Sequence, residues 1–310
     1  MSVLSEPTIE QRSDQCQELI AESGVNLIVL GFPKCGTTAF AEWLDGSALV
    51  AVSRPKETFR LCPEFSLNQS RTERVGLSTS FRSSDAPWRV EATTLNVYSA
   101  ALRQALRATP TKVVILLRDP VESVLSWHNQ MCQAGIAVSE SFDEAWQHGL
   151  QLGEELAEGN EFLRAYEVVC SYGRWVSRWL EAIGHDRTLL AYDHEVRSSH
   201  QLLGRRLEHF LATSLGLPAE VPVRNQFSAI RFPRAYAMLR RPAFKSALRT
   251  GARYVPAVDA VRRFVRERVM LRPAKKLHVD AYEFLREQFS ADQELLQSHY
   301  AANSQRWYGL

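Results

Sequence analysis

The run VNLIVLGFPKCGTTAFAEWL at residues 25–44 contains the pattern on which the fold prediction rests. Its apolar, β-branched segment 25–30 predicts a short buried strand, and 37–44, whose apolar residues recur at helical spacing, predicts a helix. A glycine-containing loop between a strand and a helix gathers backbone N–H groups at the start of that helix. The sequence therefore predicts an anion-binding loop at 31–38.

The spacing of this loop is close to G-x-x-x-x-G-K-[ST], the phosphate-binding loop of nucleotide kinases and ATPases. Gly31 and Gly36 have the required separation, but Thr37 occupies the lysine position and Lys34 lies three residues earlier. Two interpretations are open at this point. The segment is either a tight turn that binds nothing, or a loop for an anion that needs a lysine inside the loop.

Composition argues against several classes of protein. The 310-residue chain has 45% hydrophobic and 23% charged residues, which is ordinary for a soluble globular protein, and its formal charge of +2 predicts no nucleic-acid or membrane binding. No apolar run approaches the roughly 20 residues of a membrane span, and the polar, acidic start of the chain does not predict a signal peptide. Five cysteines without a C-x-x-C pair argue against a disulfide framework and a zinc site, so we expect a cytoplasmic setting.

The rest of the chain alternates between strand-like and helix-like segments. Further apolar runs predict strands at 48–53, 88–93, 112–117 and 187–192. Apolar residues repeat every three or four positions through 162–183, which predicts helix there. This alternation predicts an α/β fold with a central, mostly parallel β-sheet flanked by helices. We expect a single domain over 1–310, with 1–24 as an N-terminal extension, and a ligand at the carboxyl ends of the strands.

A second anion site is predicted where the 112–117 strand ends. The following residues, RDPVESVLSWH, begin with Arg118, whereas a nucleotide-hydrolysing enzyme would have a magnesium-binding Asp at this place. Pro120 is a good first helical residue. A helix from Pro120 would place Ser126 about two turns in, able to share an anion with Arg118. A nucleotide with phosphates at both its 5′ and 3′ ends would need both sites.

The two motifs resemble those of sulfotransferases that use 3′-phosphoadenosine 5′-phosphosulfate (PAPS). GFPKCGTTAF is similar to the family's 5′-phosphosulfate loop and RDPVESVLSWH to its 3′-phosphate motif, with weaker similarity at 189–218 and 284–300. The pattern is closest to carbohydrate-type and bacterial members. The resemblance implies a P-loop-like sulfotransferase fold, PAPS as the sulfuryl donor and no metal. It also implies the donor-binding residues, which are Lys34, Cys35, Gly36, Thr37, Thr38, Arg118 and Ser126.

The displaced lysine suits such a donor. When the sulfuryl group leaves, negative charge grows on the oxygen that bridges phosphate and sulfate. A cation inside the loop can reach this oxygen, whereas a cation on the first helical turn would point further along a polyphosphate. Lys34 is therefore interpreted as the electrostatic stabiliser of the leaving group.

Three residues are candidates for the general base that takes the proton of the acceptor. Glu57, in SRPKETFRL after the second predicted strand, matches the base of carbohydrate-type and many bacterial members in its distance from the loop. The competing interpretation is a surface carboxylate paired with Lys56. Glu91, near the end of the third predicted strand, and His128, in the predicted helix after Arg118, are the alternative bases.

The acceptor is expected to be a hydroxyl, or an amine, of a glycan or a small-molecule natural product. Residues 221–258 lack Asp and Glu but are rich in Arg, which suits an anionic glycan or is simply a solvated face. The basic segment 272–278, RPAKKLH, matches the family's late loop over the cofactor in position. Aromatic residues near the predicted cleft suit a flat or apolar acceptor instead, and they are Phe59, Phe65, Trp88 and Trp127.

Two other functions are compatible with a phosphate-binding loop. A P-loop kinase of a small molecule would need a magnesium-binding Asp and a lysine where Thr37 stands. A nucleotide-binding protein without catalytic activity would bind adenosine 3′,5′-bisphosphate but would sulfate no acceptor.

Overall fold

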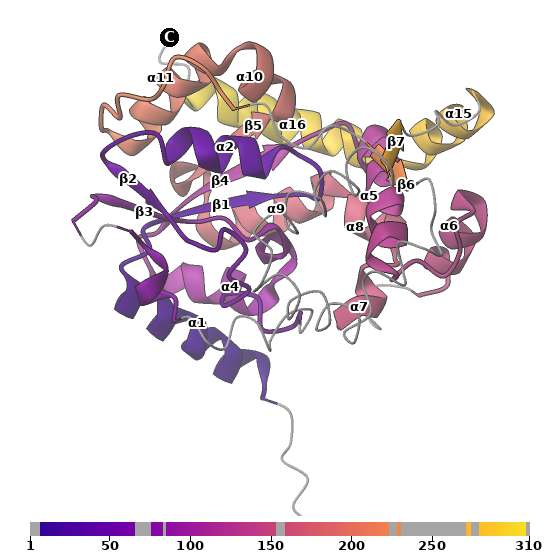
Figure 1. Cartoon of the computed structure of the whole chain (residues 1–310), viewed down its shortest axis with the longest axis horizontal. Helices are drawn as coiled ribbons and strands as arrows, with labels where there is room; N and C mark the ends of the chain where they lie inside the picture. The colour runs from indigo at the N-terminus through magenta and orange to yellow at the C-terminus, as the bar shows by residue number, and fades with distance from the viewer. Residues whose placement is uncertain are drawn as a thin grey trace, which may run out of the picture.

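The structure is a computed structural model that describes residues 7–65, 76–82, 85–152, 159–222, 228–230, 271–273 and 279–307. Within these residues, a five-stranded parallel sheet has the order β2-β3-β1-β4-β5 (Figure 1). The strands are β1 (Leu27–Gly31), β2 (Val50–Val52), β3 (Trp88–Glu91), β4 (Lys112–Leu117) and β5 (Thr188–Tyr192). Each strand overlaps its predicted run, so the predicted α/β fold with a central parallel sheet is confirmed.

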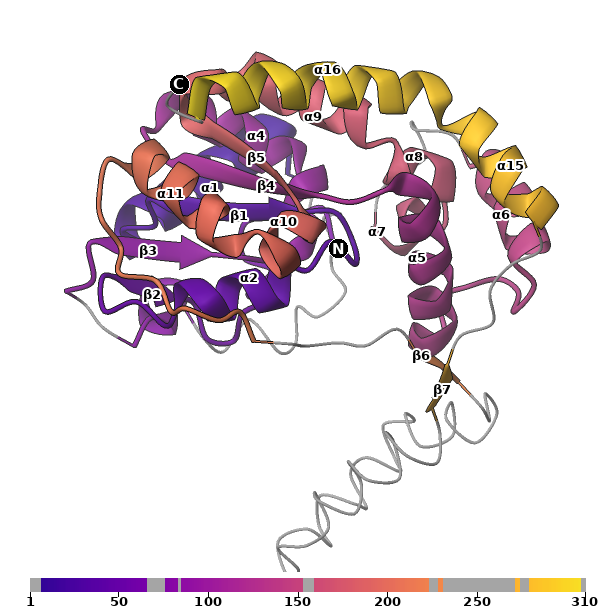
Figure 2. The ribbon, with the colours of Figure 1, turned by 90° about the horizontal axis from the view of Figure 1, so that it is seen from above.

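Helices cover both faces of the sheet (Figures 1 and 2). One face bears α1 (Ile9–Ser23), α4 (Ala100–Ala105) and α9 (Tyr172–Ile183), and the other bears α2 (Thr37–Leu44), α10 (Asp193–Ser198) and α11 (His200–Leu211). The long helix α16 (Ser290–Trp307) runs along the edge strand β5. Short 3₁₀ helices occur at η1 (Ser78–Ser80), η2 (Thr94–Tyr98), η3 (Leu106–Ala108) and η4 (His185–Arg187).

A second group of elements lies beyond the carboxyl ends of the strands, to the right of the sheet in Figure 2. Its helices are α5 (Pro120–Ala134), α6 (Phe142–Leu150), α7 (Gly159–Phe162), α8 (Tyr166–Cys170) and α15 (Val279–Gln288). A separate antiparallel pair joins β6 (Ser228–Ile230) to β7 (Leu271–Pro273). Among the described helices, none has both the length and the apolar composition that crossing a membrane requires.

Two of the predicted features cannot be placed in full. Most of the acid-free window 221–258 and of the basic segment 272–278 lies outside the described residues. The predicted N-terminal extension contains α1, which packs on α4 and contributes Cys16 and Ile20 to the main core. The assignment of 1–310 to one domain stays a prediction.

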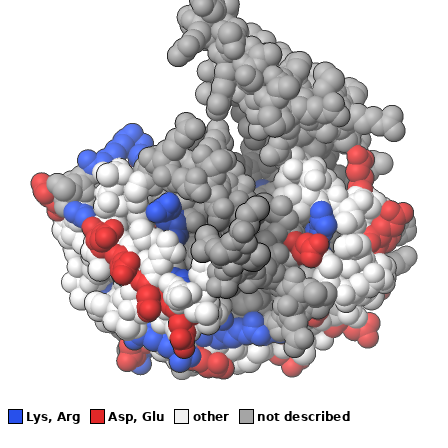
Figure 3. Space-filling view, turned by 90° about the horizontal axis from the view of Figure 1, so that it is seen from below, with Lys and Arg blue, Asp and Glu red and all other residues white. Residues whose placement is uncertain are grey.

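On the face shown in Figure 3, acidic and basic side chains are interspersed over the described surface.

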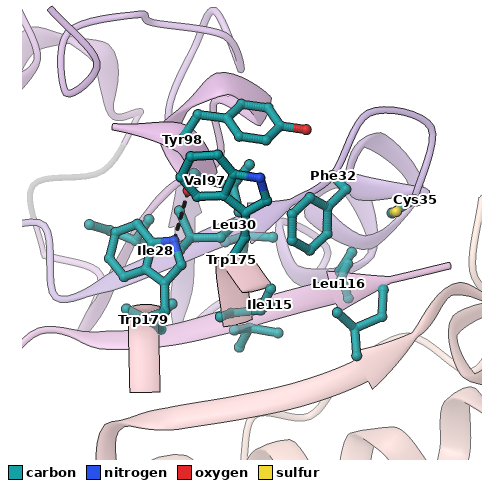
Figure 4. Packing of buried hydrophobic residues seen from close by; sticks show 14 of the residues in the cluster. Ile28, Leu30, Phe32, Cys35, Val97, Tyr98, Ile115, Leu116, Trp175 and Trp179 are labelled. Carbon is teal, nitrogen blue, oxygen red and sulfur yellow. Dashed lines mark hydrogen bonds between the residues drawn. The ribbon is translucent and has the colours of Figure 1, made fainter. Parts of the chain in front are cut away.

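The core lies between the sheet and its two layers of helices. Every residue of β1 is buried, because a central parallel strand is covered on both faces, and this explains its unbroken apolar sequence. Aromatic rings fill the space beneath α9 (Figure 4). There the Trp179 indole N–H donates to the Val97 carbonyl at 2.8 Å, and the Phe32 ring stacks on Tyr172 with centroids 3.7 Å apart.

Side chains cover the open edge of the sheet at β5. The Asn303 amide accepts from the Leu190 N–H and donates to the Thr188 carbonyl, both at 2.8 Å. The Arg206 guanidinium donates to the Leu190 carbonyl at 2.8 Å. Unpaired backbone groups on an edge strand can pair with a strand of another chain. These side-chain contacts satisfy backbone groups of β5 instead.

The predicted helical stretch 162–183 is not one helix. It is divided into α7, α8 and α9, and the breaks fall at Ala165 and Ser171, whose ψ angles of 73° and 74° are not helical. Apolar residues on both sides of each break face the same core, so their spacing stays close to helical and the sequence gives no sign of the breaks.

Strand β1 and helix α2 approach most closely at Gly31. A Cβ atom at this position would lie 2.2 Å from Thr37 Cγ2 and 3.3 Å from Leu116 Cβ. We expect Gly31→Ala to lower the free energy of unfolding by about 1–3 kcal/mol, the usual cost of overpacking. Gly76→Ala is the control, because its Cβ would meet only ordinary contacts; equal stability of the two variants in denaturant unfolding would contradict this reading.

Candidate active site

The loops that follow β1, β2, β3 and β4 meet at the carboxyl edge of the sheet, as the sequence predicted. Thr37 Oγ1, after β1, lies 3.5 Å from Thr94 Oγ1, after β3. Glu57, after β2, accepts hydrogen bonds from Thr94. The Arg118 guanidinium, after β4, donates to the Lys34 carbonyl at 3.1 Å. Residues that are far apart in the sequence therefore form one cluster around the loop 31–38.

The N-terminus of α2 presents unpaired backbone donors. Its N-cap residue, Gly36, has a φ of 80° and no side chain that could cap the helix. The Phe40 N–H donates to the Gly36 carbonyl at 3.1 Å, so the N–H groups of 37–39 precede the first bond within the helix. Free N–H groups at the positive end of a helix dipole attract anions, so this turn is suited to bind one.

Lys34 adds a positive charge that has no counter-ion among the described residues. Its backbone has a left-handed φ of 72°, and its side chain is half-buried. Burial lowers the pKa of the Lys34 ammonium, and the nearby Arg118 guanidinium lowers it further. A negatively charged ligand between these two cations would relieve both effects, since it would replace lost hydration with a direct ionic contact.

Cys35, predicted to bind the donor, faces away from this anion site. Its side chain is fully buried and lies in the core beside Phe32 (Figure 4). Its backbone N–H donates to the Phe32 carbonyl at 3.1 Å and so is already used in the turn. Burial also raises the pKa of the Cys35 thiol, which stays neutral. Neither its thiol nor its N–H is left for a ligand, whereas Thr37 and Thr38 are on the free first turn of α2.

The second predicted motif forms a helix as expected, but the structure describes no hydrogen bond between its two predicted ligand-binding residues, Arg118 and Ser126. Helix α5 begins at Pro120, and Ser126 lies two turns in. The Ser126 hydroxyl is buried and has no hydrogen-bond partner among the described residues. Arg118 instead donates to Glu122 Oε2 at 2.8 Å and lies 3.6 Å from Asp193 Oδ2. Because a buried unpaired hydroxyl is costly, Ser126 is suited to bind a ligand.

A hollow of about 470 Å³ opens beside Arg118. It lies between the start of α5, the helix α10 and the helix α16, and its lining includes Tyr192, Asp193, Arg197 and Tyr300. Neither Lys34 nor Glu57 lines it, so it adjoins the cluster at Arg118 rather than enclosing it. The sequence reasoning missed Asp193, although its place directly after β5 was a usable signal.

Glu57 is held at the edge of the sheet by three groups. Lys56 Nζ donates to Glu57 Oε1 at 2.5 Å, so the ion pair expected under the competing interpretation does form. The Thr94 N–H donates to Oε2 at 2.8 Å, and the Thr94 hydroxyl to Oε1 at 3.0 Å. The Glu57 side chain keeps 35% of its surface exposed, so an acceptor can reach it. Glu57 is thus both paired with Lys56 and placed next to the loop.

Glu91, an alternative base, is fully buried. It accepts hydrogen bonds from the Thr58 hydroxyl at 2.7 Å, the Thr93 hydroxyl at 2.5 Å, the Thr93 N–H at 3.1 Å and the Asn96 amide. Burial raises the pKa of its carboxyl, and the hydrogen bonds from Thr93 and Thr58 oppose this. The Thr93 hydroxyl in turn accepts from the Thr58 N–H at 2.9 Å. Glu91 therefore orders the loop that contains Glu57 and presents no oxygen to a substrate.

His128, the third candidate, has both ring nitrogens engaged. Nε2 lies 3.2 Å from the Glu140 carbonyl and Nδ1 lies 3.0 Å from the Tyr166 hydroxyl. Because a carbonyl only accepts, Nε2 must bear the hydrogen and Nδ1 must accept from Tyr166. Burial lowers the pKa of the His128 imidazole, against the hydrogen bond to Glu140. The geometry favours a structural role for this residue.

Of the four aromatic residues expected near an acceptor, Phe59 is half-buried and follows Glu57 by two residues. Trp127 and Phe65 are buried, and the Trp127 indole N–H donates to the Leu163 carbonyl at 2.9 Å. Trp88 is the first residue of β3, so it stands at the amino end of the sheet, opposite the cluster. The sequence identified these side chains as apolar but could not tell which of them pack into the core.

Comparison with known proteins identifies the family. The family model described as "Sulfotransferase domain" matches residues 25–196, which is more than half of the chain and includes both motifs predicted to bind anions. The chain belongs to this sulfotransferase family. The match runs from β1 to α10, so every residue of the cluster lies inside the sulfotransferase domain. No curated protein sequence matches the chain.

One solved structure agrees with this assignment at the level of the fold. The sulfotransferase from Alicyclobacillus acidocaldarius is 16% identical, with a TM-score of 0.58, and the match covers 89% of this chain and 96% of that one. The sulfotransferase domain from the curacin biosynthetic pathway is 14% identical, with a TM-score of 0.38 and coverage of 61% and 74%. The predicted sulfotransferase fold is confirmed by the first of these.

Proposed function

We propose that this sulfotransferase moves a sulfuryl group from PAPS to a hydroxyl, or an amine, of a glycan or a small-molecule natural product. The family and the fold support sulfotransferase activity. One observation supports this donor above all. The uncapped N-terminus of α2 stands beside Lys34, a half-buried cation with no counter-ion among the described residues.

The residues present fit such a donor at both of its ends. Lys34 and the N–H groups of Thr37 and Thr38 would hold the 5′-phosphosulfate. Arg118 and Ser126 would hold the 3′-phosphate, because the buried Ser126 hydroxyl lacks a partner in the described structure. Arg118 would exchange the carboxylate of Glu122, which is 58% exposed, for the phosphate. We leave Cys35 out of this set.

Two side chains perform the chemistry in this proposal. The bound donor supplies the sulfuryl group, whose bond to the bridging phosphate oxygen breaks as the acceptor oxygen bonds to sulfur. Glu57 takes the proton of the acceptor at its exposed carboxylate. Lys34 places its ammonium against the bridging oxygen and stabilises the charge that gathers there. Among the three candidate bases, Glu57 combines access with hydrogen bonds to Thr94, which in turn contacts Thr37 in the loop, so we assign the base to it and not to Glu91 or His128.

The other functions are less well supported by the same residues. A kinase of this fold would hold magnesium with a carboxylate after β4, where this chain has Arg118. A protein that only binds a nucleotide would not need an exposed carboxylate fixed next to the phosphate loop. We include a cytoplasmic setting in the proposal because all five cysteines are unpaired.

A thermal-shift measurement tests the donor site. We expect adenosine 3′,5′-bisphosphate to raise the melting temperature far more than AMP or ATP does at the same concentration, because a ligand that binds only the folded state stabilises it more the further its concentration exceeds its Kd. Arg118→Ala should abolish most of this difference. Arg306→Ala is the control: it removes an arginine of α16 that pairs with Asp186, and it should leave the difference unchanged. Equal shifts with AMP would remove the role of Arg118 and Ser126, and a larger shift with magnesium-ATP would favour a kinase.

The acceptor can be found with the same protein. Radiolabelled PAPS is incubated with a panel of desulfated glycosaminoglycans and phenols, and mass spectrometry locates the sulfate on the product. Transfer to one class identifies the acceptor chemistry. Tight binding of the bisphosphate with no transfer to any member of the panel would count for the non-catalytic function.

A further inference from the structure

Thr94 bonds to the Glu57 carboxylate through two separate donors. Its backbone N–H reaches Oε2 at 2.8 Å and its hydroxyl reaches Oε1 at 3.0 Å, so each oxygen of the carboxylate has one donor from this residue. Thr94 is the first residue of η2 and lies 37 positions from Glu57 in the sequence. No motif in the sequence singled it out.

The hydroxyl of Thr94 also reaches the donor loop. Its oxygen lies 3.5 Å from Thr37 Oγ1, on the first turn of α2. A hydroxyl has a single hydrogen, and an ionised carboxylate can only accept. The Thr94 hydrogen is therefore committed to Glu57, which leaves Thr37 as the donor in the contact between the two threonines. The three groups form a directed chain from the phosphate loop to the base.

The remaining contact of Glu57 is its ion pair with Lys56. Lys56 Nζ shares Oε1 with the Thr94 hydroxyl, and it also donates to the Ala92 carbonyl at 2.7 Å. Without the Thr94 hydroxyl, Oε1 would be held by Lys56 alone. An ion pair of this kind is weakly directional and partly exposed, so it does not fix the orientation of a carboxylate as well as two hydrogen bonds from a 3₁₀ helix do.

We propose that Thr94 is a positioning residue for the transfer reaction. Its hydroxyl orients the Glu57 carboxylate toward the donor loop and joins it to Thr37, so that the base and the donor site keep a fixed separation. In the complex proposed above, the backbone N–H of Thr37 binds the donor, so the Thr37 hydroxyl keeps its hydrogen bond to Thr94 and the bond from Thr94 to Glu57 persists. This inference rests on the proposed role of Glu57, and its test separates the two.

The test compares Thr94→Val with Thr94→Ser. Valine keeps the shape and the backbone N–H but lacks the hydroxyl, so kcat should fall about ten- to a hundredfold, the size expected for one hydrogen bond to a charged group. The donor KM and the affinity for adenosine 3′,5′-bisphosphate should stay near wild type. Serine restores the hydroxyl and should recover most of kcat. Ser139→Ala removes a matched hydroxyl-to-carboxylate bond, to Glu144 at 2.6 Å, and should leave kcat unchanged.

A double-mutant cycle with Glu57→Gln decides how Thr94 acts. If Thr94 works through Glu57, Thr94→Val should cost little in the Glu57→Gln background. Full additivity of the two losses, or a Thr94→Val enzyme with wild-type kcat, would overturn the inference while leaving Glu57 as the base. Wild-type turnover by Glu57→Gln would overturn the base and Thr94 together. If the wild-type chain transfers no label to any acceptor of the panel, the proposed function and the role of Thr94 are both overturned.

Discussion

Glu57→Gln is expected to lower turnover about 10²–10⁴-fold, the contribution typical of a general base. Glutamine keeps the shape of the side chain and can still accept from the Thr94 N–H, but it cannot take the proton of the acceptor. Donor affinity should barely change, because Glu57 has no contact with Lys34 or Arg118 among the described residues. Steady-state kinetics at saturating donor should show this loss in kcat.

Glu64→Gln is the matched control for this variant. Glu64 belongs to the same segment, but it accepts from the Ser99 hydroxyl and the Ala101 N–H, both at 2.9 Å, at the start of α4. We expect near-wild-type turnover with some loss of thermal stability. A Glu57→Gln enzyme that kept its turnover would exclude Glu57 as the base. Glu91 and His128 would then be tested next, despite their burial.

Lys34→Ala is expected to lower turnover about 10²–10³-fold, the usual loss when one preorganised electrostatic donor is removed. Lys34 acts on charge that develops on the leaving oxygen, so most of its effect should appear in kcat rather than in binding. Some donor affinity should be lost as well, since the phosphosulfate is already anionic before the reaction. Kinetics at saturating donor, combined with calorimetric titration of adenosine 3′,5′-bisphosphate, separates the two effects.

The environment of Lys34 also sets the direction of its pH dependence. Burial and Arg118 lower the pKa of the ammonium in the free protein, so its charge is lost sooner on raising the pH than that of an exposed lysine. Affinity for the bisphosphate should therefore weaken toward alkaline pH, and Lys34→Ala should flatten this change. Lys112→Ala is the control, because Lys112 stands at the amino end of β4 and donates to the Phe210 carbonyl. Equal turnover losses in both lysine variants would refute the role of Lys34.

The candidate site was only partly visible in the sequence. The spacing of Gly31, Lys34 and Gly36 predicted the loop that we propose binds the donor, because a loop of fixed length between a strand and a helix determines its own backbone geometry. The position of Arg118 directly after β4 was readable for the same reason. The proposed choice among Glu57, Glu91 and His128 was not readable, because burial and hydrogen-bond partners decide it. Those partners lie on other elements, such as Tyr166 for His128, 38 residues away.

The sequence by itself determined the five strands, the uncapped turn before α2 and the placement of functional residues after the strands, since each of these depends on near neighbours in the chain. Tertiary structure decided that Cys35 turns into the core, that Glu91 is enclosed by four donors and that Thr94 joins Glu57 to Thr37. It also divided 162–183 into three helices. Apolar periodicity shows that a residue is buried but not what it packs against. A polar side chain acquires its role only when the folded chain brings its partners, distant in the sequence, within hydrogen-bond distance.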